Sequence, residues 1–324
     1  MSQAIRIHQT GGPSVMKLEP VEVTAPGPGQ VRVRHEAIGV NYIDTYHRSG
    51  LYPVSLPSGI GLEAAGHVDA VGDGVTQFAV GDRVAYGNGP IGAYAEYNTV
   101  ASGRLANIPD AVPMEEAAAI MLKGMTARYL LKETFPVKAG DTVLYHAAAG
   151  GVGLLMCQWA RDLGVTLIGT ASTAEKCQLA LSMGAAHMIN SSQEDVVARV
   201  RELTDGEGVP VVYDGVGRDT FAISLDCLRP RGLLASFGNA SGAVTGVDLG
   251  ILTQKGSVYV TRPSLAHYVA SDDALATNTA DVFDAVARGA LSIRINQRYA
   301  LADAVQAHED LEARKTTGAS ILAP

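Results

Sequence analysis

The sequence predicts an α/β protein in which a β-rich domain precedes a doubly wound parallel sheet. Short β-branched runs fill the first third of the chain. Strand-like and helix-like segments then alternate, and the strand starts recur about every 20–25 residues, as in a βαβ array. The 324 residues also exceed what one hydrophobic core normally serves, ~250–300 residues, so at least two domains are expected.

The first domain is expected to be barrel-like. Regularly spaced short strands, separated by Gly-Pro and Gly-Asp turns, are typical of such β domains. The expected strands are Ala4–Gln9, Val31–Ile38, Ala64–Val71, Arg83–Tyr86 and Ala93–Val100. A short helix is expected at residues 42–48. A longer one is expected at 113–131, where proline and two glutamates occupy the first turn.

Six apolar runs are expected to form the parallel sheet. They are Thr142–Tyr145, Thr166–Thr170, Ala186–Ile189, Val209–Tyr213, Leu233–Phe237 and Ser257–Val260. Helical patterns lie between them, at Gly153–Leu163, Ala174–Met183, Glu194–Leu203 and Thr220–Leu228. Six strands of this kind complete a doubly wound sheet of the Rossmann type.

The tail has two helical stretches, at 272–288 and 302–314, and a last apolar run at 319–322. Because it is too short for a third domain, we expect it to return to the first. The expected boundaries are residues 1–124 for the β-rich catalytic domain, 125–262 for the Rossmann domain and 263–324 for the returning segment.

Composition narrows the class of protein. The net charge is −8 and no Lys/Arg run occurs, which disfavours nucleic acid as a partner. No stretch approaches the ~18–20 apolar residues of a membrane span, so no membrane insertion is expected. The three cysteines, Cys157, Cys177 and Cys227, form no C-x-x-C pair, and the N-terminus reads as a strand. These features favour a cytoplasmic protein.

A glycine-rich loop lies between the first strand of the sheet and its helix. The spacing Ala148-x-Gly150-x-x-Gly153 is the dinucleotide-binding pattern with alanine in first position. Gly150 would let the backbone approach a pyrophosphate, and Gly153 would let the helix pack closely. The N–H groups at the helix start would bind the phosphates. The alternative is a tight turn only, which the strand–loop–helix context disfavours.

The end of the second strand favours NADPH over NADH. NAD enzymes usually place Asp or Glu there for the ribose hydroxyls, whereas the next acid in this chain, Glu175, lies on the following helix. Ser172 and Lys176 would supply a hydroxyl and an ammonium to a 2′-phosphate. The alternative is that Ser172 caps the helix and Lys176 is solvated.

A polar and aromatic segment, Asn41–Tyr46, is typical of a pocket wall. Tyr46 and Tyr52 would offer flat faces and hydroxyls to a planar ligand. The alternative is structural, with Asn41 as a helix cap and the tyrosines half buried. Lys123, at the passage between the domains, faces either solvent or the cleft. No H-E-x-x-H, C-x-x-C or G-x-S-x-G motif occurs, so neither a metal site nor a serine nucleophile is expected.

Together these motifs resemble the zinc-free quinone oxidoreductases of the medium-chain dehydrogenase/reductase superfamily, which includes zeta-crystallin. The resemblance extends from Gly11 to Ser320. Its most specific segments are 41–46, 57–66, 122–126, 146–153, 212–220, 236–239 and 260–264. It implies a GroES-like β-barrel catalytic domain, a Rossmann domain, and homodimers joined through the Rossmann domains.

The resemblance also implies roles for individual residues. The nicotinamide and substrate cleft would be lined by Asn41, Tyr46, Lys123 and Thr126, with Tyr52 beside the acceptor. The cofactor's phosphates and ribose would be contacted by Tyr129, Gly150, Gly151, Val152 and Gly153, and its 2′-phosphate by Ser172 and Lys176. The dinucleotide would be covered by Val216, Phe237, Gly238 and Arg262.

Two positions differ from relatives. Zinc-dependent relatives carry Cys near residue 41 and His beside Glu63, whereas this chain has Asn41 and Leu62, and the four-cysteine lobe is absent. The resemblance therefore implies a zinc-free enzyme. Close relatives have tyrosine after an Ile-Asn pair, where it helps hold the 2′-phosphate. Here Ser191 follows that pair, so one contact that favours NADPH over NADH is missing.

The expected activity is direct hydride transfer from NADPH to a quinone or another activated carbonyl acceptor. Quinones are strong electrophiles, so the protein's task is to stack the acceptor against the nicotinamide in a dry cleft. One alternative is an NADPH-dependent enone or enal reductase. Another is a low-activity NADPH-binding protein, as zeta-crystallins are in the lens, some of whose relatives bind RNA. The acidic balance weighs against RNA binding.

Overall fold

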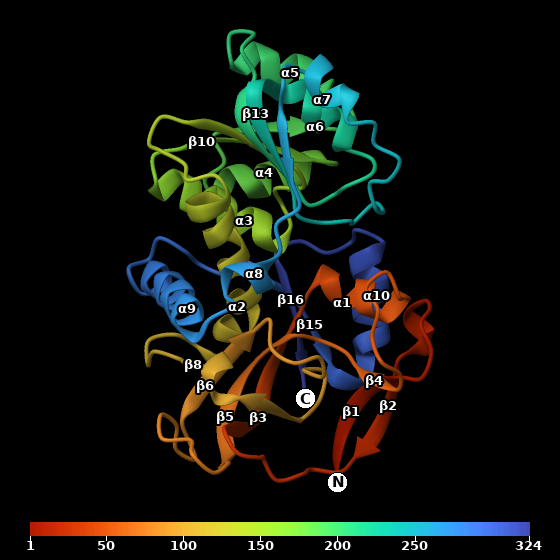
Figure 1. The fold of residues 1–324 in the computed structure, drawn as a ribbon, viewed down its shortest axis with the longest axis vertical. Coiled ribbons are helices and arrows are strands. Elements are labelled where there is room, and N and C mark those ends of the chain that lie inside the picture. The colour runs from red at the N-terminus through yellow and green to blue at the C-terminus, as the bar shows by residue number, and fades with distance from the viewer. The chain divides into compact units, whose positions relative to one another are not determined.

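The computed structural model describes all residues, 1–324, and the chain folds into two units with separate cores. Unit 1 comprises residues 1–125, 269–289 and 293–324. Unit 2 comprises residues 126–268 and 290–292. The green and cyan segments in Figure 1 belong to unit 2, and the red and orange segments belong to unit 1. None of the helices combines the length and apolar character that a membrane crossing requires.

Unit 2 contains the predicted doubly wound sheet. Its strands are β9 (Thr142–Tyr145), β10 (Thr166–Ala171), β11 (His187–Asn190), β12 (Val209–Asp214), β13 (Leu228–Ser236) and β14 (Tyr259–Thr261). All six are parallel, in the order β11-β10-β9-β12-β13-β14. The order reverses between β9 and β12, which is where sheets of this type bind their ligands. The prediction of a six-stranded Rossmann sheet is therefore confirmed.

Helices connect these strands. They are α3 (Gly151–Asp162), α4 (Ala174–Ser182), α5 (Val196–Leu203), α6 (Phe221–Cys227), α7 (Gly250–Gln254) and α8 (Leu265–Tyr268). Helix α3 packs beside β10, α4 beside β10 and β11, and α6 beside β12 and β13 (Figure 1). The core between the layers contains Leu144, Ile168, Val212 and Leu234, all fully buried. Parallel strands covered on both faces explain why these runs are almost continuously apolar.

Unit 1 is built from two sheets. Strand β1 (Ser2–Ile7) lies between β2 (Lys17–Val21) and β4 (Ser58–Gly59). The larger sheet has the order β15-β16-β3-β5-β6-β8, with β7 also paired to β3. Its strands are β3 (Gln30–Val40), β5 (Glu63–Val71), β6 (Arg83–Gly87), β7 (Tyr97–Ala101), β8 (Ala106–Asn107), β15 (Ile295–Ala300) and β16 (Ala319–Ala323).

The helices of unit 1 lie beside these sheets. They are α1 (Tyr42–Ser49), α9 (Asp272–Ala287) and α10 (Ala304–Glu312), while α2 (Met114–Tyr129) continues into unit 2 and ends in a π-helical turn at Leu130–Thr134. Short 3-10 turns occur at Pro13–Val15, Ser102–Arg104 and Leu301–Asp303. Strand β16 of the tail pairs antiparallel with β3, and β15 pairs parallel with β16.

Some expected elements differ from the structure. The strand expected at 93–100 is wrong in its first half, because only Tyr97–Ala101 pairs as a strand and Ala95 makes a single bridge to Ala4. Strands β2, β4, β8 and β15 were not expected. All four lie at sheet edges, and β15 alternates half-buried with exposed residues, so its sequence INQRYA is polar.

Two buried imidazoles make the stability of unit 1 depend on pH. Burial lowers the pKa of His35 from 6.5 to about 4 and that of His308 to about 3. Both groups therefore stabilise the fold above pH 6.5, and this stabilisation is lost as the pH falls. Asp44 opposes one of them, because burial raises its pKa to about 7. Burial also lowers the pKa of His47 and of His146 in unit 2. The net uptake of at least one proton on unfolding therefore predicts a loss of about 1.4 kcal/mol or more per pH unit from pH 6.5 down to about 4.

Urea denaturation at several pH values checks this slope. A His187→Gln variant is the control, because it removes an imidazole that is exposed in the folded protein. A free energy of unfolding that stayed constant between pH 6.5 and pH 4.5 would contradict the prediction.

Candidate active site

The first group of candidate residues surrounds the start of helix α1 in unit 1. Asn41 is the N-cap residue, in extended backbone conformation, and its N–H donates to Asp44 Oδ2 at 2.9 Å. The Asp44 N–H donates back to the Asn41 carbonyl at 3.0 Å. Asn41 also uses its side chain, because Nδ2 donates to Glu63 Oε2 at 2.7 Å. Asn41 is therefore a helix cap whose amide is aimed at a buried acid.

Glu63 is the centre of this group and is completely buried. Its Oε1 accepts the Leu122 N–H at 2.6 Å, and its Oε2 accepts Lys123 Nζ at 3.1 Å besides the Asn41 amide. Lys123 is only 5% exposed, so its ammonium faces this carboxylate rather than solvent. Gly39 makes the arrangement possible, because a Cβ there would lie 2.1 Å from Glu63 Oε2.

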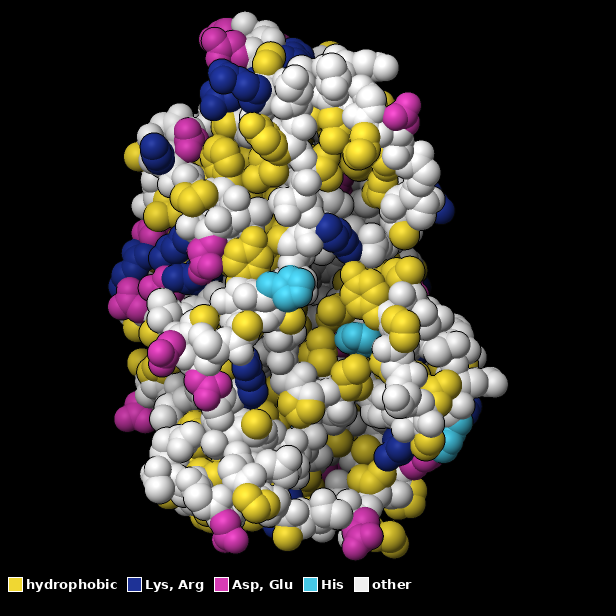
Figure 2. Space-filling model, in the orientation of Figure 1, with side chains coloured by type: hydrophobic (Ala, Val, Ile, Leu, Met, Phe, Trp, Pro, Cys, Tyr) yellow, Lys and Arg dark blue, Asp and Glu magenta, His cyan; other side chains and the backbone are white.

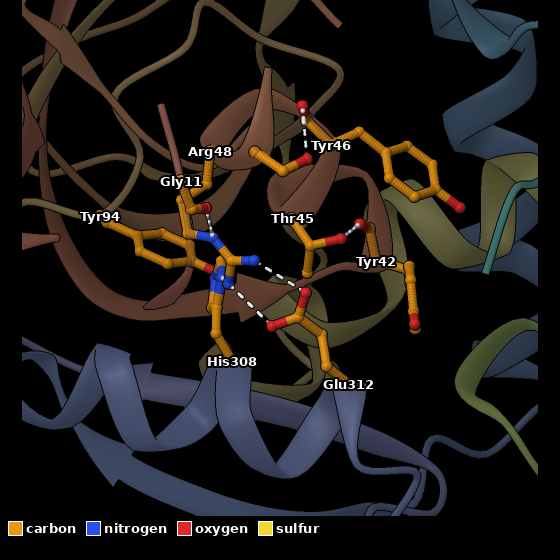
Figure 3. Close-up of polar contacts among 9 residues, drawn as sticks. Gly11, Tyr42, Thr45, Tyr46, Arg48, Tyr94, His308 and Glu312 are labelled. Atoms are coloured by element: carbon orange, nitrogen blue, oxygen red, sulfur yellow. Dashed lines mark hydrogen bonds and ion pairs between the residues drawn. The ribbon is translucent and has the colours of Figure 1, made fainter. Parts of the chain in front are cut away.

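The tyrosines form an aromatic wall beside this group. The rings of Tyr46 and Tyr52 meet edge to face, with centroids 5.2 Å apart, and Tyr42 lies 5.7 Å from Tyr46. Tyr46 is buried, whereas Tyr42 and Tyr52 are half buried. Figure 3 shows the rings of Tyr42 and Tyr46 pointing away from the Arg48 guanidinium. Such rings can offer an apolar face and a hydroxyl to a planar ligand.

The second group lies at the carboxyl edge of the sheet in unit 2. Gly150 caps helix α3 without a side-chain hydrogen bond, so the first N–H groups of the helix have no side-chain acceptor there. A Cβ at Gly150 would meet only the Ala147 carbonyl, at 3.3 Å, whereas one at Gly153 would clash with the Ala148 backbone at 2.5 Å. Gly153 thus permits tight packing, and Gly150 leaves room for a phosphate.

Two features of this loop were not expected from the sequence. Ala147 adopts φ 59°, a left-handed conformation that is strained for alanine, and its N–H donates to Thr170 Oγ1 at 3.3 Å. His146 is buried, with Nδ1 3.1 Å from Thr170 Oγ1 and Nε2 without a partner. Burial lowers the pKa of His146, so the ring is neutral at pH 7.

The end of β10 carries the residues expected to select the cofactor. The cap of helix α4 is Thr173, whose side chain accepts the Lys176 N–H at 3.3 Å. The interpretation of Ser172 as the cap is therefore wrong, and its exposed hydroxyl is not used for that purpose. Ser191, after β11, donates its hydroxyl to the Ala171 carbonyl at 3.2 Å, so it joins two strand ends.

A buried carboxylate shapes the loop after β12. Asp214 Oδ1 accepts the N–H groups of Val216 and Gly217 at 2.8 and 3.0 Å. The hydroxyls of Thr220 and Ser224 also donate to this carboxylate. Sequence reasoning did not identify Asp214 as a site residue, although an acid at the end of a buried strand was the available signal.

The loop after β13 is held against the loop after β12. The Phe237 N–H donates to the Asp214 carbonyl at 2.8 Å, and Gly238 approaches Gly215 so closely that a Cβ would lie 2.2 Å from its carbonyl oxygen. Arg262, after β14, donates to the carbonyls of Ser236 and Gly238 at 2.7 and 3.0 Å. These contacts place the expected residues Val216, Phe237, Gly238 and Arg262 at one edge of the sheet.

Tyr129 and Thr126 lie on helix α2 at the start of unit 2 and are both buried. The Tyr129 ring stacks on Tyr268, with centroids 4.3 Å apart and planes 12° from parallel. Tyr268 in turn accepts the Thr134 hydroxyl at 2.9 Å. The expected site residues thus fall into two groups, one in each unit.

Neither a metal site nor a reactive thiol is built from these residues. No group of three or more His, Cys, Asp or Glu side chains is arranged to hold a metal ion. All three cysteines are free and buried, and burial raises the pKa of Cys157 and Cys227 to about 12. Thiolate chemistry at these two positions is therefore disfavoured.

Comparison with known proteins is consistent with this geometry. Residues 27–110 match the alcohol dehydrogenase GroES-like domain, and residues 151–268 match the zinc-binding dehydrogenase family model. A quinone oxidoreductase of Pseudomonas aeruginosa is 55% identical over all of both chains. The crystal structure of Escherichia coli quinone oxidoreductase complexed with NADPH is 50% identical, with a TM-score of 0.98, and the match covers 99% of this chain and 100% of that one.

A third relative has a different named activity. The 2-haloacrylate reductase of a Burkholderia species is 46% identical over all of this chain and 99% of its own. The full-length likeness to quinone oxidoreductases is the stronger, and both domain models agree with it. The chain therefore belongs to the quinone oxidoreductase family of the medium-chain dehydrogenase/reductase superfamily.

Proposed function

We propose that this protein transfers a hydride from NADPH to a quinone or a similar activated carbonyl acceptor. The observation that carries the proposal is the start of helix α3, where the N-cap residue Gly150 offers no side-chain acceptor, at the point where the strand order of the sheet reverses. A helix N-terminus without a side-chain cap at such a switch point is suited to a pyrophosphate. Family membership supports the same assignment.

The residues of unit 2 fit a phosphorylated dinucleotide. Gly150, Gly151 and Val152 supply the backbone donors for the pyrophosphate, and Tyr129 lies on the same unit for the ribose. Ser172 is exposed and Lys176 half buried beyond β10, where a hydroxyl and an ammonium suit a 2′-phosphate. Val216, Phe237, Gly238 and Arg262 would cover the nicotinamide half. When bound, NADPH supplies the hydride equivalent that reduces the acceptor.

The residues of unit 1 would bind and orient the acceptor. Tyr46 and Tyr52 present the aromatic wall against which a planar quinone can stack. Asn41 and Lys123 would supply hydrogen-bond donors to the acceptor, and both are fixed on Glu63. Because a quinone is already electrophilic, orientation against the nicotinamide supplies most of what the reaction needs. Water then protonates the reduced oxygen.

A steady-state screen tests the proposal. The purified protein should oxidise NADPH in the presence of benzoquinones and naphthoquinones, more efficiently than NADH. The likeness to 2-haloacrylate reductase favours one second candidate, reduction of an activated alkene, so alkenals and 2-haloacrylate belong in the same panel. Turnover of alkenes but not of quinones would favour that candidate, and the absence of turnover with every acceptor would refute both.

The free edge of the Rossmann sheet supports a homodimer. Strand β14 is the last strand of the sheet, and Tyr259 and Val260 on it are 62% and 41% exposed. Leu249 nearby in sequence is 75% exposed, and Figure 2 shows hydrophobic side chains beside this strand. A free strand edge with exposed apolar side chains is suited to pairing with a second copy.

Val260→Lys is therefore expected to convert the dimer into a monomer, because it buries a charge at the paired edge. Light scattering after size-exclusion chromatography measures the mass directly. Leu181→Lys is the matched control, since Leu181 lies on α4 of the same unit and is 37% exposed. A wild-type protein that is already monomeric at micromolar concentration would contradict the dimer.

A cytoplasmic location is also proposed. It is supported by the three cysteines, which are all unpaired, as is usual in a reducing compartment. Fractionation of cells that express the protein checks this location.

A further inference from the structure

A chain of buried polar side chains runs through unit 1 and ends at Asn41. It begins at Glu312 on α10 and continues through Arg48 and His308 to Tyr94 (Figure 3). From Tyr94 it continues to Asp44. Of these residues, only Glu312 has appreciable exposure, with 35% of its side chain accessible. Burying so many polar groups is costly unless each has a partner, so the arrangement calls for an explanation.

Arg48 determines which group donates and which accepts in every hydrogen bond of this side-chain network. Its guanidinium has only donors, so Nη1, 3.1 Å from His308 Nδ1, makes that nitrogen an acceptor. A neutral His308 must then carry its hydrogen on Nε2, which lies 3.0 Å from the Tyr94 hydroxyl. With its oxygen accepting from His308, Tyr94 must donate to Asp44 Oδ2, at 3.0 Å. Burial, which lowers the pKa of His308 to about 3, keeps the ring neutral.

The hydrogen-bond chain ends at Asp44 Oδ2, the atom that holds the start of helix α1. Asp44 Oδ2 accepts both the Tyr94 hydroxyl and the Asn41 N–H, whereas Oδ1 is buried and has no partner. The Asn41 amide then donates to Glu63, which also accepts from Lys123. Two donors on one oxygen fix the carboxyl plane, and thereby the position of the Asn41 backbone.

We propose that His308 and Tyr94 are positioning residues of the reductase site, acting through Asp44 to fix the Asn41 amide against Glu63. The inference rests on the proposed function for its kinetic consequence. The hydrogen-bond chain is not a proton path from Glu312, because the Arg48 guanidinium has only donors and therefore has no acceptor with which to relay a proton. Its outer ion pair, in which Arg48 donates to both Glu312 oxygens at 3.0 and 2.7 Å, holds the guanidinium in place.

Tyr94→Phe tests the proposal kinetically, with Tyr86→Phe as its matched control. Both hydroxyls are fully buried in unit 1, and each lies 3.0 Å from the Nε2 atom of a histidine. The hydrogen-bond partners of the Tyr86 hydroxyl are His35 and Asn98, whereas the Tyr94 hydroxyl donates to Asp44. We expect Tyr94→Phe to lower kcat by about tenfold with little change in KM, since small misplacements near reacting groups are costly. Equal losses in the two variants, or no loss in either, would overturn the proposal.

Substitutions of Asp44 separate positioning from acid chemistry. In Asp44→Asn the side-chain oxygen can still accept both donors, with the NH₂ in the place of the unpartnered Oδ1. Asp44→Asn should therefore keep kcat within about threefold of the wild type, whereas Asp44→Ala should lose about tenfold. An equal loss in the two variants would mean that the ionisable carboxyl itself is needed, and the positioning role would be wrong.

The hydrogen on His308 can be observed without cofactor or substrate. In ¹⁵N-histidine NMR spectra, a ring nitrogen that carries hydrogen resonates far from one that does not, and His308→Gln identifies the signals. We expect Nε2 to carry the hydrogen at pH 7. Hydrogen on Nδ1 would contradict the donors and acceptors assigned between Arg48 and Asp44, and would overturn the proposal. If the wild type reduces no acceptor, the proposed function fails, while this spectrum still decides the hydrogen-bond direction.

Discussion

Glu63→Gln should lower the free energy of unfolding by about 3–5 kcal/mol, the usual cost of removing one partner from a buried ion pair. The carboxylate is fully buried and accepts from Asn41 Nδ2, Lys123 Nζ and the Leu122 N–H. A glutamine amide turns its NH₂ toward one or more of these donors, whichever way it is oriented. The Lys123 ammonium would then be buried without its ion-pair partner. Urea denaturation at pH 7 measures the loss.

The same variant should lower kcat/KM for quinone reduction by about a hundredfold, because Asn41 and Lys123 both lose their common anchor. The double variant Glu63→Gln with Lys123→Met separates the two effects. Removing the unpaired ammonium should recover about 2 kcal/mol of stability, but it should not restore activity. If the double variant were no more stable than Glu63→Gln alone, the ion pair would not be the source of the cost.

The Rossmann unit was largely predictable because its information is local. Thr142–Tyr145 and the glycine loop after it were placed correctly from a strand, a turn and a helix adjacent in sequence. Parallel strands buried on both faces give unbroken apolar runs, which a reader of the sequence can recognise. A polar edge strand such as β15 gives no such signal. Its place in the sheet depends on backbone pairing with β16 and not on an apolar pattern in its own sequence.

The buried polar network of unit 1 was not predictable for a related reason. Arg48 and His308 are separated by 260 positions, and Tyr94 lies 214 positions before His308. Arginine is mostly exposed in proteins, and histidine and tyrosine are only intermediate, so none of these residue types by itself indicates burial. Only the return of the tail to the first domain brings α10 beside α1. The sequence indicated that return, but it carried no indication of which polar side chains would become buried by it.

The strength of cofactor selection depends on few groups. The family resemblance of the sequence implies a tyrosine where this chain has Ser191, whose hydroxyl donates to the Ala171 carbonyl. Thr173, rather than Ser172, caps helix α4. Under the proposed function, the selection of a 2′-phosphate would therefore fall mainly on the Lys176 ammonium, together with the exposed Ser172 hydroxyl four positions before it. A change at Lys176 should consequently have a larger effect than in a relative that has the tyrosine.

Lys176→Glu should raise the KM for NADPH by about a hundredfold, since a like charge facing a phosphate costs several kcal/mol and each 1.4 kcal/mol is tenfold. The KM for NADH should change by less than about threefold, because NADH carries no 2′-phosphate. The preference between the two cofactors would then be reversed. Steady-state kinetics with one quinone and each cofactor in turn measure both constants.

The control for this change is Lys138→Glu. Lys138 precedes β9, at the amino ends of the strands, whereas phosphates bind at the carboxyl ends. The control alters the net charge by the same amount, so it should leave both KM values within about twofold if the effect is local. An equal rise in KM for NADPH and NADH in Lys176→Glu would place the lysine away from the 2′-phosphate. Selection would then have to arise from Ser172 or from the shape of the pocket.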